Sequence, residues 1–228
     1  MPELPKLTSL HVSCIDTSVV PDLPTTMTYD QLTIRARPET DLWRQPPNTD
    51  IDNAPTLLIS TPIKMDRFHS ARVTVSGNWS TPYDQGGLVL FIPDEGAMKW
   101  VKTAIEYADE KPYVEIVGTI RWSDWSSVPL KEEEGGEVTI QVEREMVNGE
   151  KMESLWVYIV DKSGEKMGLV RRINWWFTPD QKATTDSEKD RVLLIGGYAA
   201  RPRVPAGEGR EKEELVVKLG FEVKLFDN

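Results

Sequence analysis

Cysteine and histidine are almost absent from this chain, which leaves little material for redox or metal chemistry. Cys14 is the only cysteine, so the chain can form no intrachain disulfide and no thiolate metal cluster. The two histidines, His11 and His69, have no matching partners in the sequence and are expected at the surface or at strand edges. We therefore expect neither a metal nor a cofactor.

Long hydrophobic segments and a surplus of positive charge are also absent. No run of about 18 apolar residues occurs, and the segment MPELPKLTSLHVSCIDTSVV lacks a basic region that leads into an apolar run. The 27 Lys and Arg against 37 Asp and Glu give a formal charge of −10, which repels phosphate backbones and anionic membranes. The sequence predicts a cytoplasmic protein with neither nucleic acid nor a membrane as its partner.

Helical periodicity is hard to find, whereas short runs rich in β-branched and aromatic residues recur along the chain. Asn148-Gly149 and Ser163-Gly164 each stand between two such runs and predict tight hairpins. The pattern predicts an all-β, two-sheet antiparallel β-sandwich, formed by residues 1–228 as a single domain. The expected strands span residues 31–37, 56–62, 69–79, 86–93, 99–107, 113–121, 137–146, 154–160, 168–177, 192–200 and 215–226.

One predicted strand carries polar side chains on a single face. Successive side chains of a strand point to opposite faces, so Trp100, Lys102 and Glu106 point the same way, and mostly apolar residues alternate with them. A face with an aromatic ring, a cation and a carboxylate is either an ordinary solvated strand face or the floor of a ligand groove.

Tryptophan is abundant, with eight residues against five Phe and six Tyr. An indole ring suits both core packing and stacking on sugar rings. Trp79, Trp156 and one of the adjacent pair Trp175 and Trp176 stand among apolar neighbours in predicted strands and are expected in the core. Four others differ, because each adjoins polar residues: Trp43, Trp100, Trp122 and Trp125.

Several ordered motifs resemble those of a known family. YDQGGLVLF (83–91), WVKTAIEY (100–107) and SDWS (123–126) follow one another, flanked by TDLWRQP (40–46) and IGGYAARP (195–202). In this order they resemble a family of concanavalin A-like sandwich proteins of unknown function that includes the yeast "regulation of enolase" protein. The resemblance implies a concanavalin A-like jelly roll, related in shape to legume lectins and glucanases. In the last motif, Ala200 and Arg201 depart from the small polar or thiol residues of the family.

Glucanase chemistry finds little support in the sequence. The related glucanases place two carboxylates at i and i+4 on one strand, across the scissile bond. Glu106 and Glu110 have this spacing, but the strand is expected to end near Asp109, which leaves Glu110 in a turn. Glu143 and Glu145 are only two positions apart. We assign no catalytic residue.

Three carboxylates remain candidates for general acid or base chemistry if the fold draws them together: Asp84, Glu106 and Asp124. Each also has a structural interpretation. Asp84 can cap the turn before its strand, Glu106 can pair with Lys102, and Asp124 can accept hydrogen bonds from backbone amides in a turn.

Together, the motif residues predict a groove on the concave sheet face, with Trp43 and Arg44 on one wall and residues 122–126 on another. Arg171 or Arg172 could add a cation to the same face. Such a groove suits a small polar molecule or a carbohydrate, and Trp100→Ala or Lys102→Ala would then abolish binding without unfolding the protein. The candidate ligand-binding residues are Trp43, Arg44, Asp84, Gln85, Trp100, Lys102, Glu106, Trp122, Ser123, Asp124 and Trp125.

The sequence thus predicts a lectin-like binding protein without established catalysis. Two alternatives stay open: a regulatory protein that contacts a metabolic enzyme through a sheet face or the 39–55 loop, and a cofactor-independent hydrolase, isomerase or cyclase that uses carboxylates in an aromatic pocket. Asp50, Asp52 and Asn53 offer oxygen ligands for calcium, but such a short acidic segment is expected to be a solvated turn.

Overall fold

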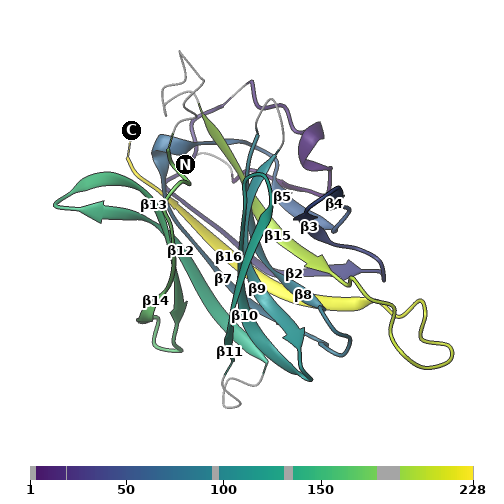
Figure 1. Cartoon of the computed structure of the whole chain (residues 1–228). Helices are drawn as coiled ribbons and strands as arrows, with labels where there is room; N and C mark the ends of the chain where they lie inside the picture. The colour runs from purple at the N-terminus through teal and green to yellow at the C-terminus, as the bar shows by residue number, and fades with distance from the viewer. Residues whose placement is uncertain (1–3, 19, 94–97, 131–135, 179–190, 228) are drawn as a thin grey trace.

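The chain folds into two antiparallel β-sheets, as predicted (Figure 1). A computed structural model describes residues 4–18, 20–93, 98–130, 136–178 and 191–227. The helical elements in these ranges are two single 3₁₀ turns, η1 (Val12–Cys14) and η2 (Met65–Arg67). Within the same ranges, no helix is long and apolar enough to cross a membrane.

The two sheets differ in size and in strand order. The eight-stranded sheet has the order β1 (Leu7–Thr8), β5 (Thr56–Ile59), β15 (Val192–Ala200), β8 (Gln85–Ile92), β9 (Lys99–Ala108), β10 (Lys111–Thr119) and β11 (Ser123–Pro129), and β6 (Ile63–Lys64) also pairs with β15. The six-stranded sheet has the order β14 (Lys166–Ile173), β13 (Glu150–Val160), β12 (Glu137–Val147), β7 (Phe68–Gly77), β16 (Leu215–Leu225) and β2 (Thr26–Ala36).

The alternation predicted for residues 99–107 is what positions the candidate site. Val101 and Ile105 of β9 lie in the main hydrophobic core between the sheets. Trp100 belongs to a second apolar cluster on the opposite face of the same strand. Period two places Lys102 and Glu106 on that face as well. We call this face of the eight-stranded sheet, turned away from the six-stranded sheet, the site face.

The segment 39–55, predicted to be a structured loop over one end of a sheet, contains a β-hairpin. Its strands β3 (Leu42–Gln45) and β4 (Thr49–Asp52) pair with each other in a separate two-stranded sheet. Leu42 packs in the second apolar cluster, and the Arg44 amide donates to Ser123 Oγ at 3.0 Å. The hairpin therefore covers part of the site face and forms one wall above it.

The SDWS segment is also a strand, where the sequence suggested a turn. In β11, Trp125 pairs with Val117 and Asp124 pairs with Gly118 of β10. Neighbouring side chains of a strand point to opposite faces, so Trp125 faces the site and Asp124 faces the other way.

The predicted hairpin turn at Asn148-Gly149 is confirmed. It joins β12 to β13, and both residues have positive φ, 52° for Asn148 and 85° for Gly149. Two positive φ angles in succession match the twist of antiparallel strands, and Asn-Gly adopts them at little cost.

The core prediction for tryptophan is confirmed for one of the adjacent pair and wrong for Trp156. Trp176 is buried in the main core, whereas Trp175 is partly buried against it; both residues follow β14, and their rings lie 5.5 Å apart. Trp156 is only half-buried, because its neighbours Leu155 and Val157 take the core side of β13.

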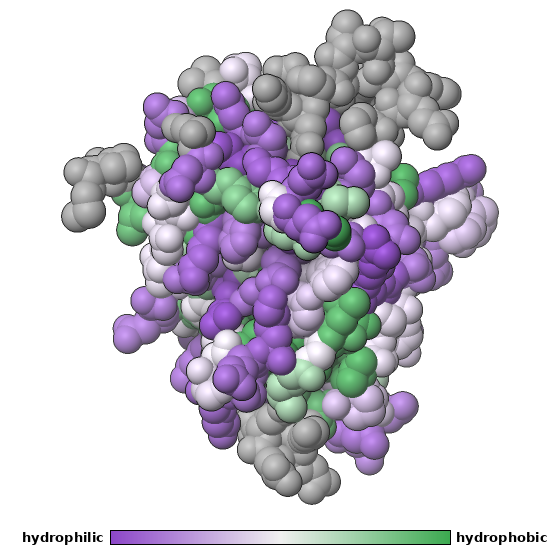
Figure 2. Space-filling view, turned by 90° about the vertical axis from the view of Figure 1, so that its left-hand side faces the viewer, coloured by the Kyte–Doolittle hydropathy of each residue, from purple (hydrophilic) through white to green (hydrophobic). Residues whose placement is uncertain are grey.

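Figure 2 shows one side of the molecule, where hydrophilic residues predominate and hydrophobic residues form small groups.

Candidate functional site

A cavity of about 420 Å³ opens on the site face beside the β3–β4 hairpin. Its lining combines exposed aromatic rings with a buried polar floor. Trp125 and Tyr83 are 45% and 41% exposed, whereas Lys102 and Glu106 are 1% and 5% exposed. The lining consists of Asp41, Trp43, Gln45, Thr49, Ile51, Tyr83, Gln85, Lys102, Glu106, Trp125, Pro202 and Arg203.

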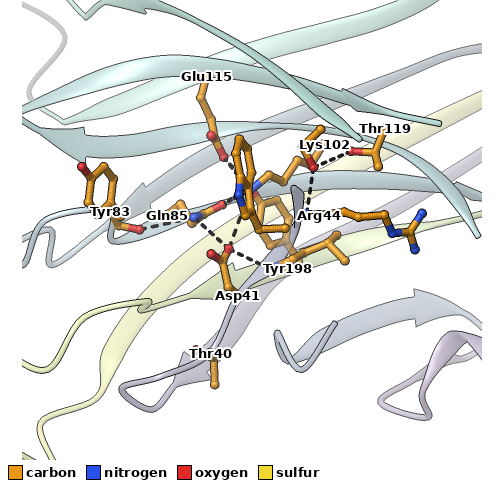
Figure 3. A network of polar contacts seen from close by, with 12 residues as sticks. Thr40, Asp41, Arg44, Tyr83, Gln85, Lys102, Glu115, Thr119 and Tyr198 are labelled. Atoms are coloured by element: carbon orange, nitrogen blue, oxygen red, sulfur yellow. Dashed lines mark hydrogen bonds and ion pairs between the residues drawn. The ribbon is translucent and has the colours of Figure 1, made fainter. Parts of the chain in front are cut away.

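Lys102 is the centre of a buried polar network under the cavity (Figure 3). Its Nζ donates to Gln85 Oε1 and lies 3.6 Å from Glu115 Oε1 and 4.0 Å from Asp41 Oδ1. The Tyr198 hydroxyl donates to Glu115 Oε1 at 2.7 Å. The acceptors around the buried ammonium offset the cost of its desolvation, and together they hold Lys102 in one position.

Glu106 differs from the other acids, because it adjoins a second buried carboxyl group. Its side chain is hydrogen-bonded to Glu115, and burial together with the Glu115 charge raises the pKa of Glu106 to about 10. Burial also raises the pKa of Asp41, against the opposing charge of Lys102. Glu106 therefore carries a proton at neutral pH. The predicted pairing of Lys102 with Glu106 is replaced by contacts of Lys102 with Glu115 and Asp41.

The raised pKa of Glu106 predicts a pH-dependent stability. The folded protein retains a proton that the unfolded chain releases above about 4.5, so the free energy of unfolding falls as pH rises from 4.5 towards 10. Glu106→Gln should remove this penalty, because the amide donates to Glu115 without a titratable proton. We expect a gain of about 1–3 kcal/mol at neutral pH, measured by urea unfolding across this range.

The matched control is Glu110→Gln, which changes an exposed acid in the turn that follows the same strand. It should leave the pH profile of the wild-type protein unchanged. A Glu106→Gln variant with the wild-type profile would show that Glu106 is ionised in the folded protein.

Asp84 lies beneath the site and does not line the cavity, contrary to the groove hypothesis. Its carboxylate accepts two hydrogen bonds of 2.7 Å from Arg201 and one each from the amides of Ser80 and Thr81, at 3.0 and 2.9 Å. Both Asp84 and Arg201 are fully buried. The predicted cap of the turn is confirmed, and no free carboxylate remains here for acid or base chemistry.

Trp100 and Arg44 also have structural roles and do not line the cavity. The Arg44 guanidinium lies 4.5 Å from the centre of the Trp100 ring, and Trp100 is only 1% exposed. Arg44 Nε donates to Asp50 Oδ1 at 2.9 Å, and its Nη1 donates to the carbonyls of Met98 and Ile120 at 3.2 and 3.3 Å. These contacts fasten the hairpin over Trp100, so neither side chain reaches the cavity.

Ser123 and Asp124, two of the remaining predicted wall residues, point to opposite faces of β11 because side chains alternate along a strand. Asp124 is exposed on the face opposite the site, and Arg171 Nη2 donates to it, so Arg171 is not a cation of the site face. Ser123 accepts from the Arg44 amide and lies 2.9 Å from Thr119 Oγ1. Trp122 precedes β11 and lies against Arg121, outside the lining.

The carboxylate spacings seen in the sequence form no catalytic pair. Glu110 lies in the turn after β9, as predicted, where it has a positive φ of 61°. Glu143 and Glu145 belong to β12 of the other sheet; Lys166 pairs with the former and Arg172 with the latter, at 2.7 and 2.9 Å. Arg172 is therefore also remote from the site face.

The acidic segment with Asp50 and Asp52 was expected to be a solvated turn, but both residues lie in strand β4. Asp50 pairs with Arg44, and Asp52 Oδ2 lies 3.2 Å from His11 Nε2. Sequence reasoning missed two residues of the polar network beneath the cavity, Glu115 and Tyr198. It also missed seven residues of the lining: Asp41, Gln45, Thr49, Ile51, Tyr83, Pro202 and Arg203. Glu115 could have been recognised from the sequence as a candidate site residue, because it is the one charged residue within the apolar run YVEIVGTI.

Comparison with known proteins supports the fold. Residues 21–214 match the model of a family described as "Protein of unknown function (DUF1349)". An uncharacterized protein of Emericella nidulans is 40% identical over 179 residues, which cover 78% of this chain and 80% of that protein.

Two solved structures are similar. A functionally unknown protein from Saccharomyces cerevisiae has a TM-score of 0.61 at 20% identity, covering 98% of this chain and 97% of that one. The catalytic domain of an endo-1,3-β-glucanase from Thermotoga petrophila has a TM-score of 0.53 at 11% identity, covering 87% and 78%. The sandwich is thus concanavalin A-like, as predicted.

Proposed function

Because the chain belongs to the DUF1349 family, whose function is unknown, we propose its function from the cavity: it is a lectin-like protein that binds a small polar molecule or carbohydrate on the site face. The observation that carries this proposal is the combination of exposed aromatic rings with a fixed polar floor. Binding sites for small ligands combine apolar walls with a few directed polar groups in this way.

The aromatic walls favour a carbohydrate. Trp43, Tyr83 and Trp125 come from three different segments and line one cavity. Large rings left exposed to water in a cavity can cover the apolar face of a sugar ring, while the Asp41 carboxyl group in the lining offers a hydrogen-bonding group for its hydroxyls. The likeness to the endo-1,3-β-glucanase concerns the fold alone and sets no substrate.

Trp125→Ala is expected to weaken saccharide binding at least tenfold, because a central aromatic contact of a small-ligand site carries much of its binding energy. Binding would be measured by titration calorimetry with a panel of soluble mono- and oligosaccharides. Trp122→Ala is the matched control, since this indole lies three positions away and outside the lining. Equal affinities for both variants and the wild-type protein would contradict the proposed site.

A cofactor-independent enzymatic role is the second candidate, favoured by the protonated carboxyl group at the floor. A carboxylic acid that keeps its proton at neutral pH can act as a general acid. Glu106 is that group here, and the other two members of the predicted trio, Asp84 and Asp124, do not line the cavity. This role would be supported if the wild-type protein turned over a saccharide that it binds, and if the Glu106→Gln variant still bound that saccharide but did not turn it over.

Contact with a metabolic enzyme in the cytoplasm, including the link to regulation of enolase that the resemblance implies, stays a prediction. The β3–β4 hairpin and the rim of the cavity are the surfaces for it. Purified enolase mixed with the protein and with its Trp43→Ala variant would test it by sedimentation.

A further inference from the structure

The rim of the cavity carries an arginine, Arg203, that has no ion pair and no hydrogen bond among the described residues. By the rim we mean the exposed lining residues Gln45, Tyr83, Trp125 and Arg203. Apart from Arg121, every other arginine of the described chain forms an ion pair or a hydrogen bond within the protein. Arg203 is therefore a cation in the cavity wall that is available to a ligand.

The backbone holds Arg203 at this opening. Two residues earlier, Arg201 is fully buried in its pair with Asp84. The Arg201 amide donates to Thr40 Oγ1 at 3.0 Å, and its carbonyl accepts from the Thr40 amide at 3.3 Å. Pro202 then fixes φ at the next position. The chain is thus anchored immediately before Arg203, which limits how far this side chain can move from the rim.

Tyr83 gives the guanidinium of Arg203 a flat surface, at 5.7 Å from the centre of its ring. Its φ is 70°, in the left-handed region that a bulky residue rarely adopts. The Tyr83 amide donates to the Tyr107 carbonyl at 2.7 Å, which holds this conformation. Backbone strain of this kind is concentrated where function requires a side chain in a particular place. The ring is 41% exposed, and its hydroxyl has no hydrogen-bond partner among the described residues.

The rim offers mainly hydrogen-bond donors. Gln45 Oε1 accepts from Trp43 Nε1 at 2.8 Å, which leaves the NH₂ group of the Gln45 amide for a ligand. Tyr83 adds a hydroxyl and Arg203 adds a guanidinium. An arginine that lies against an aromatic ring can still present two parallel N–H groups to the two oxygens of a carboxylate. The rim is therefore suited to a negatively charged group rich in acceptors.

The acidic groups of the floor are directed at Lys102 and not at the rim. Asp41 Oδ1 and Glu115 Oε1 lie 4.0 and 3.6 Å from Lys102 Nζ. Glu106 is hydrogen-bonded to Glu115 and carries no charge at neutral pH. A charge at an opening to water interacts chiefly with its nearest partner, because water weakens the more distant interactions. For a carboxylate at the rim, that partner is Arg203.

We infer that the ligand of this cavity is an acidic sugar, a uronic acid, whose carboxylate accepts hydrogen bonds from the Arg203 guanidinium while its ring lies against Trp125. This inference rests on the proposed carbohydrate function and names the class of sugar. The carboxylate lies at the rim, and the neutral hydroxyls point towards the floor. A uronic acid has a carboxylate where its parent sugar has a CH₂OH group, so the two ligands isolate this one contact.

The test compares two pairs of sugars by titration calorimetry at neutral pH: D-glucuronate with D-glucose, and D-galacturonate with D-galactose. A bidentate, charge-assisted contact at an exposed position should make the acid of at least one pair bind about three- to tenfold more tightly. Arg203→Gln should abolish this preference and leave the affinity for the neutral sugar unchanged. It removes no ion pair within the protein, so thermal unfolding should match that of the wild-type protein.

Arg121→Gln is the matched control. Arg121 is also exposed and also lies against an aromatic ring, 5.3 Å from the centre of the Trp122 ring, but outside the lining. Both variants remove one positive charge, so they change the attraction of the whole protein for an anion equally. An effect confined to Arg203→Gln therefore reports the local contact.

The outcomes separate the inference from the proposed function. Equal affinities within both pairs, weakened in Trp125→Ala, would overturn the acidic-sugar inference and leave the carbohydrate site standing. A preference for the acids that survives in Arg203→Gln, or that disappears equally in Arg121→Gln, would also overturn it. If none of the four sugars shifts the Trp125 indole resonance in NMR spectra, the carbohydrate function fails, and the inference fails with it.

Discussion

Replacing Arg201 with alanine is expected to lower the free energy of unfolding by about 3–5 kcal/mol, measured by urea or thermal unfolding. Arg201 and Asp84 form a bidentate pair, with Nε and Nη2 each 2.7 Å from a carboxylate oxygen, and neither side chain is exposed. Removing the guanidinium leaves the Asp84 charge buried without its counterion, which is more costly than the loss of the contact itself.

The pair also joins separate parts of the chain. Arg201 follows β15, Asp84 precedes β8, and Arg201 Nη1 donates to the Glu213 carbonyl at 2.7 Å. Loss of Arg201 should therefore also loosen the 202–214 segment, which includes the rim residue Arg203. Increased amide hydrogen exchange in this segment would report that effect separately from global stability.

Two further variants make the Arg201 prediction decisive. Arg210→Ala breaks an ion pair with Glu213 in which both side chains are partly exposed, and it should change stability little. The double variant Asp84→Asn with Arg201→Gln removes both charges and keeps polar side chains, so it should recover more than half of the loss. If Arg201→Ala were no less stable than Arg210→Ala, the buried pair would not stabilise this fold.

Local sequence patterns were sufficient to predict the sandwich and part of the site. Period-two alternation assigned Lys102 and Glu106 to one face, and the structure has both in the lining of the same cavity. Their placement needs only that residues 99–107 form a regular strand, which depends on nearby residues. Trp43, Gln85 and Trp125 of the predicted set also line the cavity.

The failures concern contacts that depend on distant parts of the chain. Asp124 was grouped with Trp125 because SDWS was taken as one pocket-like turn, although a strand sends these neighbours to opposite faces. Arg201 stood out only as a departure from a family motif. Its buried role depends on Asp84, 117 positions away in the sequence.

Among the predicted site residues, Trp100 is the one for which the structure most changes the expected effect of an alanine substitution. The groove hypothesis expects Trp100→Ala to abolish binding without unfolding the protein. The structure instead buries the ring, with 1% exposed, in the apolar cluster with Leu42, Phe91 and Tyr198. Truncating a buried aromatic ring to alanine leaves a cavity, and we expect a loss of about 3–5 kcal/mol in the free energy of unfolding.

A conservative variant separates packing from hydrogen bonding. Trp100 Nε1 is buried and has no hydrogen-bond partner among the described residues, so Trp100→Phe gives up no hydrogen bond. It also keeps an aromatic face under the Arg44 guanidinium, which lies 4.5 Å from the ring centre in the wild-type protein. Trp100→Phe should therefore lose less than about half of what Trp100→Ala loses.

Trp125→Ala completes the comparison, because the two indoles lie on the same face at opposite extremes of burial. Trp125 is 45% exposed, so its truncation should change stability by less than about 0.5 kcal/mol while it weakens binding. Trp100→Ala should do both, since loss of the ring frees Arg44 and with it the hairpin that holds Trp43 over the cavity. Stable folding of Trp100→Ala with binding lost would return Trp100 to the ligand site and contradict the packing of the hairpin described above.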